Sequence, residues 1–112
     1  MVRTYAALLS KDLGPLPPVD TACRGSADAC RAALDQAAVV AGKAQDDLQQ
    51  TPAEPAVIQK PVEDIRSAAR FVVSIAQAVD GGSMSTSEAV NAYMAEYNAI
   101  AQALQQVQAA AQ

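Results

Sequence analysis

The chain lacks the residues that most enzymes use for catalysis. Its 112 residues include no histidine, and only five are glycine. Without histidine there is no usual general base, no usual zinc ligand and no partner to activate a serine or cysteine nucleophile near neutral pH. No Gly-rich phosphate loop of the Walker or dinucleotide type occurs either. We therefore expect a protein that is not an enzyme and has no catalytic residues, metal ligands or cofactor.

Positive charge and long apolar runs are also missing. Eight basic residues stand against twelve acidic ones, and none of the basic residues lies beyond Arg70. Nucleic acids require clustered Lys and Arg, so a nucleic-acid partner is not expected. No apolar run approaches the roughly 18 residues of a transmembrane helix. The opening "MVRTYAALLSKDLG" has too short an apolar stretch for a signal peptide, so we expect any export signal or lipid anchor to precede Met1.

Apolar residues are abundant, and alanine is the commonest of them. In three long segments they recur every three or four positions, which is the spacing of helices that pack against one another. These rows are Cys30, Leu34, Ala37, Ala41, Ala44 and Leu48; Ile58, Val62, Ile65, Ala69, Val72, Ala76 and Val79; and Val90, Tyr93, Tyr97, Ile100, Leu104, Val107 and Ala111. With one Phe and no Trp, such a core must form by close backbone approach.

Capping signals set the predicted bounds at 27–50, 54–80 and 86–110. Ser26 is placed to cap the first helix, and Ser85 with Glu88 forms a capping box for the third. For the second, Thr51 and Glu54 form a similar box, and "DGGS" with Gly81 ends it. Pro61 lies within this segment, which predicts either a kink or a short separate turn before it.

The N-terminal part supplies a fourth, shorter helix over 2–13, followed by a Pro-rich linker over 14–26 that we expect to be extended. The second long helix carries an additional apolar row, and we expect the short helix to pack beside it. The row consists of Ala68, Phe71, Ile75 and Ala78. The predicted fold is a single all-α domain, an up-and-down antiparallel four-helix bundle.

Two cysteines, Cys23 and Cys30, lie seven positions apart where the linker meets the first long helix. Their spacing matches no common zinc or redox pattern. A structural disulfide fits best, because Cys23 lies in a linker that can fold back onto Cys30. Two unpaired thiols remain the alternative. A disulfide would indicate an oxidising, extracytoplasmic compartment.

Two further groups are candidate sites. Tyr5, Tyr93 and Tyr97 could line an apolar pocket that offers hydroxyls to a ligand, or simply fill the core. On the third helix no charge follows Glu96, and glutamines take the polar positions. A surface without charge loses little on burial, so it could bind a protein partner or a second copy. The glutamines concerned are Gln102, Gln105, Gln106 and Gln108.

The segments "CRGSADACRAALDQAA" and "VEDIRSAARFV", with a Tyr-containing first helix, a proline-marked break and an Ala-rich final helix, resemble small helical-bundle domains of exported proteins and lipoproteins of high-GC bacteria. Some of those domains carry a second cysteine pair where this chain has "TPAEPAVIQKP". The resemblance implies the fold and an extracytoplasmic location, but no activity. We therefore expect a non-catalytic interaction or ligand-binding module. The alternatives are a structural or assembly domain that associates through the final helix and, last, an enzyme that depends on a cofactor the sequence does not reveal.

Overall fold

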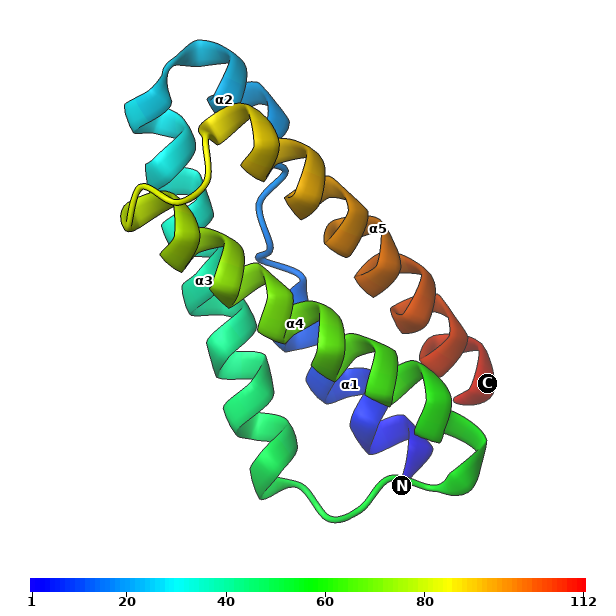
Figure 1. Cartoon of the computed structure of the whole chain (residues 1–112). Coiled ribbons are helices and arrows are strands. Elements are labelled where there is room, and N and C mark those ends of the chain that lie inside the picture. The colour runs from blue at the N-terminus through cyan, green and yellow to red at the C-terminus, as the bar shows by residue number, and fades with distance from the viewer.

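The computed structural model describes residues 1–112, and all of its regular structure is helical (Figure 1). The three long helices α3, α4 and α5 lie antiparallel, and α1 runs beside one half of their length (Figure 1). The predicted all-α antiparallel bundle is confirmed. The elements are α1 (Val2–Leu13), α2 (Asp20–Gly25), α3 (Ala27–Gln50), the 3-10 helix η1 (Ala56–Ile58), α4 (Gln59–Asp80) and α5 (Thr86–Ala110).

The first two apolar rows form the core as predicted, because every residue in them is buried. The row on α5 is turned away from its predicted orientation. Tyr93, Ile100 and Val107 are buried, together with Ala89 and Ala103, which the row did not include. Val90, Tyr97 and Leu104 are only half-buried. One apolar edge of α5 is therefore left partly open.

The position predicted for the short helix was wrong. α1 packs against α3 and α5, not beside α4. The wide apolar face of α4 is instead shared between α3 on one side and α5 on the other. Of its additional row, Ala68 and Ile75 are buried within the bundle, whereas Phe71 is 57% exposed. α3 and α5 therefore occupy the apolar surface of α4 that was expected to receive α1.

The linker is also not extended throughout. Residues Pro15–Val19 have no helical structure after the turn that ends α1, but Asp20–Gly25 forms α2. Asp20 at the start of α2 pairs with Arg24 one turn later, at 3.2 Å, and an acid near a helix N-terminus is favourable. The fourth corner of the bundle thus consists of two short helices joined by a thin segment.

The second long helix begins later than predicted. Thr51 ends α3 and donates its hydroxyl to the Asp47 carbonyl, while Glu54 forms a two-point ion pair with Arg66. The predicted capping box is therefore absent. A separate turn, η1, precedes α4, and Pro61 lies in the first turn of α4, where a missing N–H costs nothing. Of the two outcomes predicted for this segment, the short separate turn before Pro61 is the one that forms.

The other helix ends follow the capping signals closely. Ser26 caps α3 by accepting from the Ala29 N–H, and the reciprocal capping box of Ser85 and Glu88 starts α5. α4 ends in a Schellman motif, but its left-handed residue is Gly82, with φ 80°, instead of the predicted Gly81.

Candidate functional site

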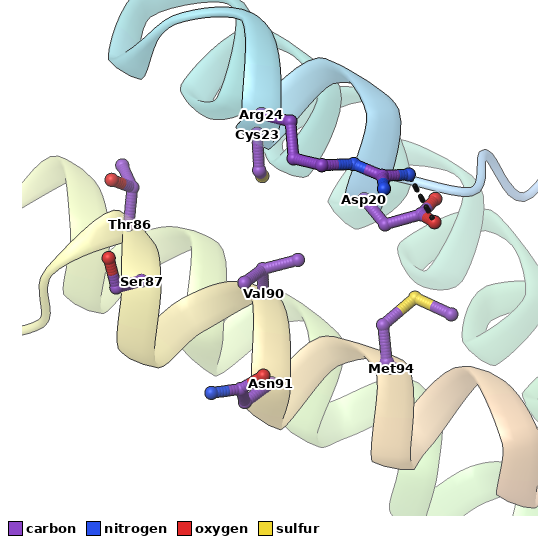
Figure 2. A pocket seen from close by; sticks show the side chains of 8 residues that line it. All are labelled: Asp20, Cys23, Arg24, Thr86, Ser87, Val90, Asn91 and Met94. Carbon is purple, nitrogen blue, oxygen red and sulfur yellow. Dashed lines mark hydrogen bonds and ion pairs between the residues drawn. The ribbon is translucent and has the colours of Figure 1, made fainter.

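A groove with a volume of about 490 Å³ lies between α2 and the first half of α5. Figure 2 shows side chains of the two helices facing each other across it. The α2 side carries a charge pair and a disulfide sulfur, and the α5 side alternates hydroxyl, amide and apolar groups. The lining residues are Asp20, Cys23, Arg24, Thr86, Ser87, Val90, Asn91 and Met94.

The α2 wall is held by the disulfide between Cys23 and Cys30, which confirms the predicted pairing. Cys30 is fully buried at the first turn of α3, whereas Cys23 is half-buried and borders the groove. No residue of α2 is fully buried, so α2 has little hydrophobic anchoring of its own. The covalent link to α3 therefore fixes where this wall stands.

The groove combines polar groups without net charge and an apolar surface. Arg24 and Asp20 neutralise each other, and Thr86, Ser87 and Asn91 provide donors and acceptors. Val90 and Met94 project toward α2 in Figure 2 and form the apolar surface. Such a lining suits a ligand that has both hydrogen-bonding and apolar parts.

A second, smaller hollow of about 180 Å³ lies farther along α5, where the end of α1 and the linker pass. Six of its seven lining residues are hydrophobic. They are Leu13, Leu16, Tyr97, Ile100, Ala101 and Leu104, and the seventh is Gly14.

The three predicted tyrosines do not line one pocket. Tyr5 is fully buried and donates its hydroxyl to the Pro52 carbonyl in the α3–α4 connection. Tyr93 is fully buried and donates to the Pro17 carbonyl at 2.6 Å. Burial raises the pKa of both hydroxyls, so each stays a hydrogen-bond donor. Of the three, only Tyr97 borders a hollow, with its ring centroid 6.0 Å from that of Tyr93.

The four predicted interface glutamines all lie exposed on α5. Gln108 donates to the Ser10 hydroxyl of α1 at 3.0 Å, so it helps to hold the bundle together. Gln102, Gln105 and Gln106 make no side-chain hydrogen bond within the chain. Their role at an interface stays a prediction.

Asp12 is the only buried charged residue in the chain. Its Oδ1 lies 3.2 Å from Lys43 Nζ, which also contacts Asp47 at 2.9 Å, whereas its Oδ2 is buried without a partner. Burial raises the pKa of Asp12 most, and a hydrogen bond that Asp12 donates to Asp47 once it is protonated raises it further; the same contact lowers the pKa of Asp47. The charge of Lys11 also lowers the pKa of Asp47. The half of α5 after Glu96 has no charged residue that could act on Asp12, Lys43 or Asp47.

We predict that Asp12→Asn gains stability relative to the parent chain as the pH rises from 4 to 7. Because the pKa of Asp12 is raised in the folded chain, protonated Asp12 stabilises the fold. This stabilisation is fully present below the unfolded pKa of about 3.9 and is lost as the pH rises through the folded pKa. Asn cannot ionise and can still donate to Asp47. Thermal unfolding at several pH values measures the difference. The exposed Asp46→Asn serves as the charge control, and an equal pH trend in both variants would refute the assignment.

Of the eight residues lining the larger groove, sequence reasoning singled out only Cys23 as a site residue. The relevant signal was present, because Thr86, Val90, Met94, Tyr97, Ala101 and Leu104 follow a three- and four-residue spacing along one edge of α5. Part of this row had been assigned to the core. The spacing could not show that the part of the bundle facing this edge is only a short helix, α2, and the non-helical segment Pro15–Val19.

Comparison with family models, curated proteins and solved structures yields no match to this chain. No helix combines the length and apolar character that a membrane crossing requires.

Proposed function

We propose that this chain is a non-catalytic, extracytoplasmic ligand-binding module and that its binding site is the groove between α2 and α5. The size and lining of this groove are the observations that support the proposal. Its volume of about 490 Å³ falls within the roughly 300–1,000 Å³ of small-molecule sites, and it combines apolar surface with a few polar groups. The sequence offers no histidine to support chemistry on a ligand held there.

The disulfide and the resemblance to domains of exported bacterial proteins support the extracytoplasmic location. Disulfides persist in oxidising compartments, and this one fixes a wall of the groove. Protein taken from its native cells and alkylated without reductant should have no alkylated cysteine by intact mass. Two alkylated cysteines would contradict the proposed location.

Binding is tested by two-dimensional NMR with a library of small polar and apolar fragments. We expect the fragments that bind to shift the amide signals of α2 and of residues 86–94, because these border the groove. The exposed apolar side chains Val39 and Val57 lie outside it and report non-specific adsorption. Hits that shift Val39 and Val57 as strongly as Val90, or no hits at all, would contradict a binding role.

The alternative, an assembly domain, is supported by the uncharged outer face of α5. Gln102, Gln105 and Gln106 are exposed there without partners in the chain, and such a face loses little on burial in a dimer. Light scattering over a concentration series tests it. Concentration-dependent mass that Gln105→Glu abolishes would support assembly, and a strict monomer would exclude self-association.

A further inference from the structure

The two hollows lie end to end on one face of α5. The larger is bordered by residues of α5 from Thr86 to Met94, and the smaller by residues from Tyr97 to Leu104. The spacing of three and four places both sets along the same edge of the helix. At 1.5 Å per residue this edge is about 27 Å long.

The two hollows exist because the fourth corner of the bundle is unevenly filled. α1 fills it at one end and α2 at the other, but Pro15–Val19 between them is not helical. In Figure 1 this thin segment passes beside α5, which is a complete helix over the same stretch. The bond from the Tyr93 hydroxyl to the Pro17 carbonyl ties the segment down in the middle. Half-buried Met94 and Tyr97 stand one turn apart at the junction of the two hollows.

Polarity changes along this edge. The hollow near the disulfide contains an ion pair, two hydroxyls and an amide, whereas six of the seven residues around the hollow near Leu104 are hydrophobic. The polar end holds one acid and one base in contact, so it has no net charge to offer a charged group. An anionic group at this end would lie beside the Asp20 carboxylate as well as Arg24, so it would gain little net attraction for its lost hydration, whereas a hydroxylated group can bond to both.

Resting on the proposed function, we infer that the ligand class is a single-chain amphiphile with an uncharged, hydroxyl-rich head, such as an alkyl glycoside or a monoacylglycerol. The head lies among Thr86, Ser87 and Asn91, beside the Asp20–Arg24 pair. The chain crosses Met94 and ends in the hollow of Leu16, Tyr97 and Leu104. Each part of the ligand then meets a surface of its own polarity.

The test is calorimetric titration of the intact chain with octyl, decyl and dodecyl maltoside, each below its micelle concentration, and with sodium decanoate. Each methylene that leaves water gains about fourfold in affinity, so two added carbons should gain at least about tenfold until the apolar hollow is full. Decyl maltoside should bind more tightly than decanoate, because its head carries no charge.

Two variants of α5 locate the chain. Ala101 and Ala99 are both exposed and lie two positions apart, but only Ala101 borders the apolar hollow. Ala101→Arg should lower the affinity for decyl maltoside at least about tenfold and remove the gain from added carbons, whereas Ala99→Arg should bind like the parent chain. Circular dichroism confirms that both fold.

Equal affinities of the two variants, tighter binding of decanoate, or no binding of any maltoside would overturn this ligand class. Fragments or an amphipathic peptide that bind in the groove when maltosides do not would overturn the ligand class alone and leave the binding module standing. Failure of both fragments and maltosides would overturn both.

Discussion

Replacement of Tyr93 with alanine is expected to lower the free energy of unfolding by about 3 to 5 kcal/mol. Tyr93 is one of the two largest fully buried side chains in a core otherwise rich in alanine. Its hydroxyl also bonds to Pro17, 76 residues away in sequence, and so joins α5 to the linker. The loss combines a large cavity with release of the thin segment of the fourth corner. Urea denaturation measures it.

Two conservative variants separate these contributions. Tyr93→Phe keeps the ring and leaves the Pro17 carbonyl unpaired, so we expect a loss of about 1 to 2 kcal/mol. Tyr97→Phe serves as the control, because the Tyr97 hydroxyl bonds to no group in the chain, and its cost should stay within about 0.5 kcal/mol. Equal losses in the two Phe variants, or a loss below about 1 kcal/mol for Tyr93→Ala, would contradict this role for Tyr93.

Removal of the disulfide should have the second largest effect. A Cys23→Ser, Cys30→Ala double variant is expected to lose about 2 to 3 kcal/mol, because the short loop between the cysteines becomes free in the unfolded chain. Alanine suits position 30, which is fully buried. Denaturation of the variant, compared with the oxidised parent, measures the loss.

The same variant should loosen one wall of the groove. No residue of α2 is fully buried, so without the link to α3 its amides should exchange with solvent much faster than those of the α3 core. Affinity for decyl maltoside should fall together with this protection. An α2 that stays as protected as before would show that packing, and not the disulfide, holds the wall.

The bundle could be predicted from the sequence because the features that produce its helices are local. The apolar spacing and the caps at Ser26 and Ser85 act within one or two turns, so the helices at 27–50 and 86–110 have their predicted bounds. The same reasoning failed at Glu54, which pairs with Arg66 twelve positions away instead of capping a helix. A contact of that kind depends on how the helices meet, which no local pattern states.

The groove could not be predicted for a related reason. Spacing shows that Val90, Tyr97 and Leu104 lie on one edge of a helix, but not whether a neighbour covers that edge. The answer depends on the opposite corner, where prolines keep Pro15–Val19 thin and α2 is short. Likewise, the hydroxyls of Tyr5 and Tyr93 could have faced a ligand, but they donate hydrogen bonds to the carbonyls of Pro52 and Pro17 in distant loops.

The most direct test of the account is a methyl NMR titration of the intact chain with decyl maltoside. We predict shifts concentrated at Val90, Met94 and Leu104, which follow the open edge of α5 from the polar to the apolar hollow. Val39 and Val57 are more than two-thirds exposed on other parts of the molecule and should not move. Shifts spread equally over both sets of methyl groups, or confined to Val39 and Val57, would contradict it.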